Sequence, residues 1–575
     1  SFLEKTARLF TLAWDDDLVP IALLSISLIA MIFLLFHRSK RWKNFKGLIL
    51  IYLVIYQIPY AYSLLNGLSY PQLRWIYLLA GMAGLSVAVF VQECNDLKKK
   101  EGFSLGLSLF LYLFIVWYYR SDANQTALII GFFLFLLILM RGLGKRVPKT
   151  VRTLFPAVLL LLIALEAAVT MNHLLAEDRY GAEFETKASL QSYYDGDLQG
   201  AIDALRPEED FYRIEVVKQD RNNLPVYYGY PSTALYNSMT NGRVIDWLFE
   251  RNVGSNVLRS GYNGFDGIAA YQSFLGVKYQ IIDEDEAAKP LYGSVYKRTI
   301  NGYAIYQNPF AGPPAFVVGE NDAGKEGFFW EMDQEGVDFQ VSDVKDISLN
   351  DRTILVEEKE GFVEFILADV KEKELYFQLK NVYHEDPSKS FAVTIEEVGE
   401  NNEKTREIRN RENQYYMGVH DMTMNLGASD EKERTFRLFF SKEGSYTVDS
   451  LFFSAVDWKE QVEKFEKILD KGAKHFVFEG DRMEASFDVE GPDATAVFPI
   501  PYSEGWQAEV NGVKTKPLAW QEAFIGVPVE QGNTLVTLTY RTPGLRTGAV
   551  LSVFALLGIY GLIRTENRRR NKKPS

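Results

Sequence analysis

The sequence contains one cysteine and five histidines among its 575 residues. Because Cys94 has no second cysteine to pair with, a disulfide within the chain is excluded, and so are metal sites built from several cysteines. The histidines show no i, i+4 pair or other ligand spacing, so a zinc site is not expected. Nucleophile-elbow, phosphate-loop, HExxH and dinucleotide-binding motifs are also missing in the context that each requires. These absences leave no firm expectation of a cofactor.

Charge is distributed very unevenly along the chain. Residues 1–172 carry 17 Lys/Arg against 9 Asp/Glu, and residues 546–575 carry 7 against 1. Residues 173–545 carry 38 basic and 65 acidic groups, a net charge of −27. A surface this acidic repels phosphate, so nucleic acid is not expected as a partner. An acidic body between apolar, basic ends indicates a membrane protein with a large water-facing domain.

Seven apolar stretches have, or nearly have, the length of about 20 residues that a membrane-spanning helix needs. They are Leu18–Phe36, Gly47–Leu65, Trp75–Val91, Phe103–Tyr119, Thr126–Met140, Phe155–Leu174 and Thr547–Ile563. Alternate connections (37–46, 95–101, 141–152 and the tail 564–575) hold 19 Lys/Arg, whereas 66–74 and 119–125 hold two. The basic connections are therefore expected on the cytoplasmic side. The alternative is that one short stretch is a buried helix.

This orientation places the acidic domain outside the cell and the C-terminus in the cytoplasm, in a multi-pass protein of the cell membrane. The expected fold is an α-helical polytopic membrane domain of seven spans with a large extracellular α/β and all-β (sandwich) domain. Since the chain begins outside without Met or a signal peptide, we expect further helices upstream of Ser1.

Within the water-facing domain, mixed helical and strand patterns give way near residue 328 to alternation with a period of two, which is typical of a β-sandwich. Asn511-Gly512 predicts a hairpin turn. The expected division is 1–174 for six spans, 175–327 for an α/β subdomain, 328–457 for a β-sandwich, 458–472 for a connecting helix, 473–545 for a second β-sandwich, 546–563 for the last span and 564–575 for a basic cytoplasmic tail.

Two candidate sites lie at the outer ends of expected spans. Asp16 is the middle of three consecutive aspartates that either hold a divalent cation or act as a base, or form a charge cluster at a helix N-terminus. Arg74 is the one cation of the 66–74 connection, where a guanidinium can bind a phosphate through two hydrogen bonds. Its alternative role is to lie at headgroup depth beside Tyr70 and Trp75 in an aromatic belt.

Two further candidates come from burial and aromatic content. Glu166 lies in the middle of the expected span Phe155–Leu174, where a carboxylate is costly and marks either function or an interhelical contact. Tyrosines are dense between residues 227 and 279, and Tyr236 and Tyr262 are among them. Aromatic faces bind sugar rings, although most such tyrosines are half-buried core.

Several segments together resemble one family. LNGLSYPQLRW, YGYPSTALYNSM, YNGFDGIAAYQSFLGVKYQIID and FPIPYSEGWQAEVNG, followed by YRTPGLRTG, occur in this order along nearly the whole chain. They resemble the YfhO family of bacterial polytopic membrane proteins. The resemblance implies a GT-C-type glycosyltransferase that transfers a sugar from a polyprenyl-phosphate carrier, at the outer leaflet, to a cell-wall polymer such as lipoteichoic acid.

The resemblance also implies roles for the candidates. Asp16 and Glu166 become candidate catalytic acids, Arg74 and Tyr70 candidate contacts to the lipid-linked sugar, and Tyr236 and Tyr262 candidate sugar contacts. Such enzymes usually carry the main catalytic acid after their first span, which is expected upstream of this chain. Membrane lipids, the lipid-linked sugar and the polymer are the expected partners. The alternatives are a non-catalytic glycan-binding scaffold and a flippase for lipid-linked sugars.

Overall fold

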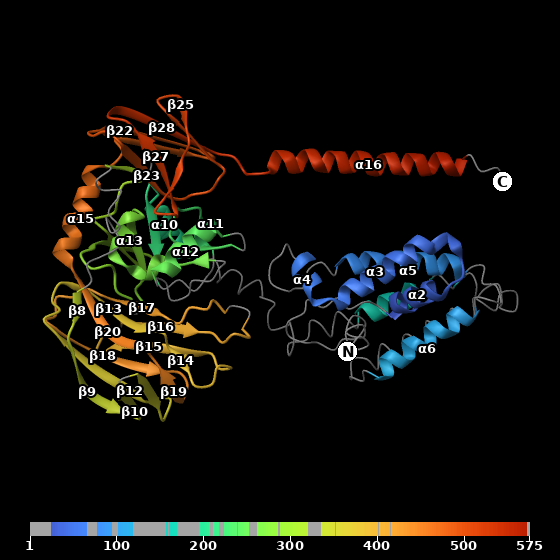
Figure 1. The fold of residues 1–575 in the computed structure, drawn as a ribbon, viewed down its shortest axis with the longest axis horizontal. Helices are drawn as coiled ribbons and strands as arrows, with labels where there is room; N and C mark the ends of the chain where they lie inside the picture. Colours follow the sequence, from blue (N-terminus) through green and yellow to red (C-terminus); the bar gives the residue numbers. More distant parts are fainter. Residues whose placement is uncertain are drawn as a thin grey trace. The chain divides into compact units, whose positions relative to one another are not determined.

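The computed structural model divides the chain into two compact units, residues 1–194 and 195–575. The structure describes residues 25–65, 77–94, 102–118, 154, 157–158, 160–168, 195–206, 211–217, 223–237, 240–251, 261–285, 288–319, 335–350, 352–400, 402–413 and 416–571. Each unit is described by itself below (Figure 1).

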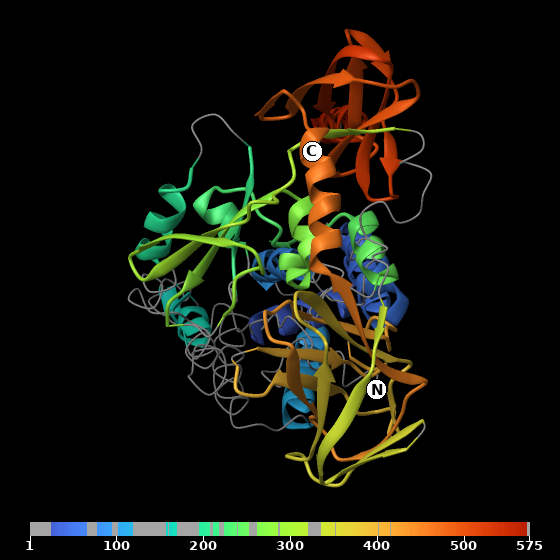
Figure 2. The same ribbon diagram turned by 90° about the vertical axis from the view of Figure 1, so that its left-hand side faces the viewer.

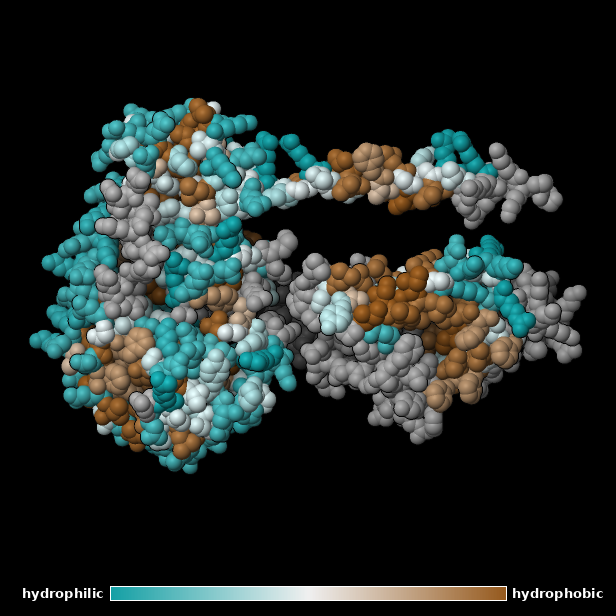
Figure 3. All heavy atoms as spheres, viewed as in Figure 1, coloured by the Kyte–Doolittle hydropathy of each residue, from teal (hydrophilic) through white to brown (hydrophobic). Residues whose placement is uncertain are grey.

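The first unit is helical. Its helices are α2 (Ser25–Phe36), η1 (Lys40–Trp42), α3 (Lys43–Gln57), α4 (Pro59–Leu65), α5 (Tyr77–Cys94) and α6 (Gly102–Tyr118). Helix α2 packs against α5 and α6, and its side chains from Ile26 to Leu34 are almost completely buried. By contrast, α3 exposes Leu50 and Ile51, and α6 exposes Phe103. Figure 3 shows this apolar outer surface in brown. Apolar side chains on the outside of a helix group are typical of contact with lipid.

Polar contacts bring three helix ends together in this unit. The Trp42 indole donates to Oε1 of Glu93 at 2.8 Å, and His37 lies 3.7 Å from the other oxygen of Glu93. The Ser104 hydroxyl donates to the Phe36 carbonyl at 3.0 Å. The C-terminal ends of α2 and α5 and the N-terminal end of α6 therefore lie side by side. The flanks of the basic connections 37–46 and 95–101 thus share one end of the unit, as the charge pattern predicts.

One helix among the described residues is long and apolar enough to cross a membrane. It is the Leu545–Thr565 part of α16 (Leu545–Asn571), with a mean hydropathy of 1.7 and exposed side chains. Shorter apolar helices cover Ile26–Phe36, Leu78–Glu93 and Gly102–Phe114. The structure thus supports one candidate span and a β-rich domain, while the expected number of seven spans stays a prediction. The expected span Thr126–Met140 lies outside the described residues.

The second unit begins with a small α/β part. A four-stranded sheet has the order β1-β4-β6-β5, in which β1 runs parallel to β4 and the other pairs are antiparallel. The strands are β1 (Arg213–Val216), β4 (Val277–Asp283), β5 (Val295–Ile300) and β6 (Tyr303–Gln307). The helices are α10 (Gly196–Asp203), α11 (Leu224–Tyr228), α12 (Gly242–Glu250), η5 (Gly264–Gly267) and α13 (Ala269–Phe274), and β2 (Leu235–Tyr236) pairs with β3 (Gly261–Tyr262).

A first β-sandwich follows. Its sheets have the orders β16-β15-β18-β12-β9, β17-β13-β20-β8 and β10-β11-β19-β14. The strands are β8 (Glu335–Val337), β9 (Phe339–Lys345), β10 (Ile347–Asn350), β11 (Thr353–Val356), β12 (Phe362–Ala368), β13 (Lys373–Lys380), β14 (Tyr383–His384), β15 (Phe391–Glu397), β16 (Glu403–Ile408), β17 (Met422–Gly427), β18 (Glu433–Phe440), β19 (Gly444–Thr447) and β20 (Ser450–Asp457). On β12, β15 and β18 every second side chain enters the core, which confirms the predicted alternation.

Helix α15 (Trp458–Asp470) joins this sandwich to a second one, and Figure 2 shows it in orange between the two. The sheets of the second sandwich have the orders β21-β22-β28-β24-β25 and β26-β27-β23-β7. The strands are β7 (Phe316–Val318), β21 (His475–Glu479), β22 (Arg482–Val489), β23 (Ala494–Pro501), β24 (Trp506–Val510), β25 (Val513–Thr515), β26 (Leu518–Trp520), β27 (Phe524–Val529) and β28 (Gly532–Tyr540). Asn511 and Gly512 have φ of 50° and 81° between the paired residues Val510 and Val513, which confirms the predicted hairpin turn.

The first sandwich is an insertion into the second. Strand β7 precedes the first sandwich in the chain, yet it pairs with β23 of the second. The backbone of Val317 donates to the Lys471 carbonyl at 3.0 Å, and that of Ala473 donates to the Ala315 carbonyl at 2.8 Å. The chain therefore leaves and re-enters the second sandwich at one place, with α15 as the returning segment.

A buried ion pair joins strands β15 and β18 of the first sandwich. Arg434 of β18 donates from Nε to Oε1 of Glu397 at 2.6 Å and from Nη2 to Oε2 at 2.9 Å, and it also donates to the carbonyls of Leu426 and Gly427. Burial would raise the pKa of Glu397, but the hydrogen bonds and charge of Arg434 outweigh it, so this pKa lies below its usual value. Arg437, on the same strand, makes a more exposed pair with Glu364 at 2.9 Å.

We expect Arg434→Ala to destabilise the protein by about 3–5 kcal/mol, because it leaves the buried Glu397 carboxylate without its bidentate partner and with only the half-exposed Lys289 at 3.9 Å. Arg437→Ala, the matched control on β18, should cost about 1 kcal/mol or less. Thermal unfolding of the purified full chain in detergent compares the two. Equal losses of Tm would show that burial does not distinguish these pairs.

Candidate functional site

Three of the sequence candidates, Asp16, Tyr70 and Arg74, lie outside the described residues. Glu166 is described within the helical residues 160–168. Its side chain is 4 % exposed, whereas Leu161 and Leu165 are 67 % and 51 % exposed. The carboxyl group therefore points into the first unit while the apolar side chains point outward.

The structure brings Tyr236 and Tyr262 together. They lie on the paired strands β2 and β3, where Leu235 is opposite Tyr262 and Tyr236 is opposite Gly261. The Asn223 side chain fixes β2, because it accepts from the backbone of Tyr236 at 2.9 Å and donates to its carbonyl at 2.7 Å. Tyr236 is 39 % exposed, while the Tyr262 ring packs edge-on against Phe265 at 5.4 Å.

One charged side chain of β1, Arg213, lies near Tyr262. Arg213 is half-buried, and it donates to the carbonyls of Leu275 and Pro499, the latter at 2.8 Å. Burial lowers the pKa of Arg213 to about 10, and it raises the pKa of Tyr262 although the Arg213 charge acts the other way. The contact to Pro499 on β23 ties the α/β part to the second sandwich.

Glu215, two residues further along β1, is the strongest titratable candidate. Burial raises the pKa of its carboxyl to about 7, despite hydrogen bonds from Gln280 and Gln272 and the charge of Lys404. Nε2 of Gln280 lies 3.4 Å from Oε2 of Glu215. Gly264 (φ +60°) passes so close that a Cβ at this position would collide with the Glu215 carboxylate. A carboxyl group with this pKa can take up or release a proton near neutral pH.

Unused hydrogen-bonding groups lie in the same region. Among the residues that the structure describes, the buried Tyr230 hydroxyl and the buried Oε1 of Gln272 have no hydrogen-bond partner. Burial raises the pKa of Tyr230, and the neighbouring Glu215 charge raises it further. A protonated Glu215 could donate to the free oxygen of Gln272, which its carboxylate form cannot do.

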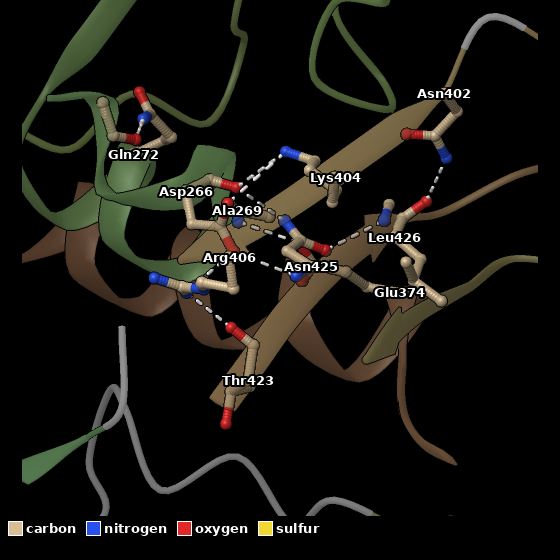
Figure 4. A network of polar contacts seen from close by, with 12 residues as sticks. Asp266, Ala269, Gln272, Glu374, Asn402, Lys404, Arg406, Thr423, Asn425 and Leu426 are labelled. Carbon is tan, nitrogen blue, oxygen red and sulfur yellow. Dashed lines mark hydrogen bonds and ion pairs between the residues drawn. The ribbon is translucent and has the colours of Figure 1, made fainter. Parts of the chain in front are cut away.

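A second group of polar residues includes Asp266, Lys404 and Arg406 (Figure 4). The charge of Lys404 also acts on Glu215. Asp266 of η5 accepts from the Asn425 backbone at 3.0 Å and lies 3.5 Å from Lys404 and 3.7 Å from Arg406. Arg406 also donates to the Thr423 carbonyl at 2.6 Å, and burial lowers its pKa although the Asp266 charge raises it. These contacts join the α/β part to strands β16 and β17 of the first sandwich.

Glu374 of β13 completes this group. Its Oε1 accepts from the Ala269 backbone at 3.0 Å and from Asn425 at 3.1 Å, and its Oε2 accepts from Gln461 of α15 at 2.8 Å. Burial raises the pKa of Glu374, and the hydrogen bonds limit the rise. Its donors come from α13, β17 and α15, so this carboxyl group fixes the positions of these three elements relative to β13.

The sequence reading missed Arg213, Glu215, Asp266, Glu374 and Arg406. One signal was present for the first two, because they lie on the same side of the short apolar strand FYRIEVV. Among the described residues, no group of three or more His, Cys, Asp or Glu side chains has an arrangement that could hold a metal ion. The three aspartates around Asp16, the candidate cation site, lie outside the described residues.

A helical unit with apolar outer faces, a candidate span and an acidic β-rich domain together indicate a membrane protein with a large β-rich domain. A family model described as bacterial membrane protein YfhO matches residues 6–328 and 321–552. The chain therefore belongs to the YfhO family, which confirms the resemblance.

One curated relative is the uncharacterized protein YfhO of Bacillus subtilis (strain 168), which is 22% identical over 596 residues. The match covers 95% of this chain and 66% of the relative, so the chain spans a little under two thirds of the relative's length.

Two kinds of solved structure show a weak likeness. A carbohydrate-binding module (CBM6cm-2) from Cellvibrio mixtus lichenase 5A, in complex with cellotriose, is 12% identical with a TM-score of 0.14, over 24% of this chain and 95% of the module. The arabinofuranosyltransferase AftD from Mycobacteria is 10% identical with a TM-score of 0.13, over 49% of this chain and 31% of the enzyme. Scores this low establish neither fold nor function.

Glu215 makes stability depend on pH. Its pKa rises from 4.5 to about 7 on folding, so the fold favours the protonated form. Stability that is present below pH 4.5 is lost as the pH rises to 7, by up to about 3 kcal/mol at 1.4 kcal/mol per pKa unit. Glu215→Gln keeps the size and removes the charge, so its Tm should exceed that of the wild type only slightly at pH 5 and by much more at pH 8.

Thermal unfolding of both full chains between pH 5 and 8 measures this gap. Glu443→Gln, in an exposed turn, is the control and should show no gap at either pH. A gap for Glu215→Gln that stays constant over this range would show that Glu215 does not titrate there.

Proposed function

We propose that this protein transfers a sugar from a polyprenyl-phosphate carrier to a cell-wall polymer, such as lipoteichoic acid, at the outer leaflet of the cell membrane. The observation that carries the proposal is Glu166, whose buried carboxyl group lies in the helical residues 160–168, where every other side chain is apolar. A carboxylate in such surroundings is costly and is kept mainly where function requires it. Membership of a bacterial membrane protein family agrees with this setting.

The chemistry needs three groups. A base takes the proton of the acceptor hydroxyl as its oxygen bonds to the anomeric carbon, and the bond from that carbon to the phosphate oxygen breaks. A cation stabilises the departing polyprenyl phosphate. We assign the first role to Glu166 or Asp16 and the second to Arg74, with Tyr70 beside it. Tyr236 and Tyr262 are proposed to contact the sugar or the acceptor.

The proposed topology places the β-rich domain outside the cell. The motivation is the concentration of Lys/Arg in alternate connections together with the acidity of residues 173–545. With Cys94→Ser as background, single cysteines at Lys359, in an exposed turn of the first sandwich, and at Lys572, in the basic tail, should behave oppositely. On intact cells an impermeant thiol reagent should label the former alone. Labelling of the tail cysteine alone would invert the topology and end the outer-leaflet proposal.

Transfer should depend on the acid and on the cation. We expect Glu166→Gln and Arg74→Ala each to reduce transfer at least about 100-fold, as for the loss of an acid–base group or of one group that stabilises the developing charge. Arg120→Ala, which removes the cation of the other weakly basic connection, is the matched control and should transfer normally. The measurement is the sugar content of the acceptor polymer in a deletion strain complemented at equal protein level.

Two results would contradict this proposal. A deletion strain whose cell-wall polymers keep their full sugar content would exclude the transferase role. Normal transfer by both Glu166→Gln and Arg74→Ala would remove these residues from the mechanism.

A further inference from the structure

A partly exposed tyrosine is held rigidly at the edge of the first sandwich. Tyr383 lies on the edge strand β14, and it is 43 % exposed. Its ring stacks on the imidazole of His420, with centroids 4.1 Å apart and planes 24° apart. An exposed tyrosine ordinarily has rotational freedom, which this stacking restricts.

The supporting imidazole is itself fixed at both nitrogens. Nδ1 of His420 lies 3.1 Å from the Val382 carbonyl, which can only accept a hydrogen bond, so Nδ1 carries the proton. In the neutral ring Nε2 then accepts from the Tyr416 hydroxyl at 3.2 Å. We call Tyr383, His420 and Tyr416 the aromatic platform. Its orientation is set before any ligand arrives, which lowers the entropy cost of binding.

Polar side chains surround the turn next to the platform. Asn381 has φ of +52°, and its backbone donates to Asp421, the residue after His420, at 2.9 Å. Its side-chain amide donates to Asp449 at 2.6 Å, and Lys380 lies 3.4 Å from Asp421. These groups hold one another in place through their mutual contacts. The two carboxylates keep unused hydrogen-bonding capacity, since a carboxylate offers about four acceptor positions.

We propose that the aromatic platform and this polar turn bind a neutral pyranose ring of a cell-surface glycan. The C–H face of a pyranose packs on the electron-rich face of an aromatic ring, while its hydroxyls need donors and acceptors at the ring edge. The platform supplies the aromatic face. Asn381, Asp421 and Asp449 supply the donors and acceptors for the hydroxyls. This inference deepens the proposed function and rests on it, because it names the part of the acceptor that the domain holds.

Charge selects a neutral ligand over a polyanion. The turn contributes two carboxylates against one lysine, and residues 173–545 as a whole carry a net charge of −27. A chain of glycerol phosphates would be repelled from such a surface. The ligand is therefore a sugar unit and not the phosphate backbone of an anionic polymer.

The test is direct binding by the purified full chain in detergent. The probes are immobilised trisaccharides of glucose, of galactose and of N-acetylglucosamine, with poly(glycerol phosphate) as the anionic probe. At least one trisaccharide should bind, and poly(glycerol phosphate) should not. Tyr383→Ala should weaken binding about tenfold or more, whereas Tyr383→Phe, which keeps the ring, should bind like the wild type.

Two further variants guard against misfolding and unspecific aromatic contact. Asn381→Gly removes the amide and tolerates the positive φ, and it should also weaken binding. Tyr296→Ala removes a tyrosine that is 53 % exposed on the edge strand β5, and it should bind like the wild type. Absence of binding to all three trisaccharides, or unchanged binding by Tyr383→Ala and Asn381→Gly, would overturn the proposal. Stronger binding of poly(glycerol phosphate) would overturn it as well.

The failures of the two proposals are distinguishable. Arg74→Ala should bind trisaccharide normally whether or not it transfers sugar. A chain that binds sugar through Tyr383 but leaves polymer glycosylation unchanged on deletion would refute the transferase alone. Normal transfer without any sugar binding would refute the platform alone.

Discussion

The packing of the β-rich part of the second unit depends on the buried Glu374 carboxyl group. It is 2 % exposed, at a point where α13, β17 and α15 meet the strand that carries it. A buried carboxyl group is tolerated only when its oxygens are satisfied, and here each donor comes from a different element. Displacement of any one element would remove one of these donors, and displacement of α15 would remove the donor to Oε2. The network therefore fixes how the α/β part, the first sandwich and α15 pack against one another.

The left-handed turn beside it depends on the same contacts. Phe265 and Asp266 have φ of 48° and 59°, values that cost free energy for residues other than glycine. Asp266 is held by Lys404, Arg406 and the Asn425 backbone, all from the first sandwich. An inserted domain thus stabilises the strained turn of the part that precedes it. The paired ends of the insertion at 315–317 and 471–473 keep this arrangement closed.

Local patterns predicted local structure well. The alternation on β12, β15 and β18, the α15 helix and the Asn511-Gly512 turn all follow from short-range rules. The sites were harder, because strand β13 buries both faces: Leu375 and Phe377 enter the sandwich core, while Glu374 and Gln378 are buried on the other side. Read alone, KELYFQLK has an apolar side and a polar side that would be assigned to solvent. Only the contacts with α13 and α15, distant in sequence, cover that polar side.

The position of β7 was unpredictable for the same reason. A three-residue strand carries too little pattern to indicate its partner, and its pairing with β23 spans more than 170 residues of chain. Glu166 is the opposite case. One charged residue in a long apolar stretch is visible from the sequence alone, and the structure places it facing inward as an apolar surrounding requires.

Charge separates two parts of the proposed reaction, the recognition of the phosphate and the binding of the neutral sugar. A lipid-linked sugar carries its negative charge at the phosphate, and the strongly acidic domain has no net attraction for that group. Recognition of the phosphate must then come from cations near the membrane, where Arg74 is expected. The domain can contribute contacts that do not depend on charge, such as aromatic faces and hydroxyl-binding amides. In the proposed reaction, this acidity would therefore assign phosphate recognition to cations near the membrane and the neutral part of the glycan to the domain.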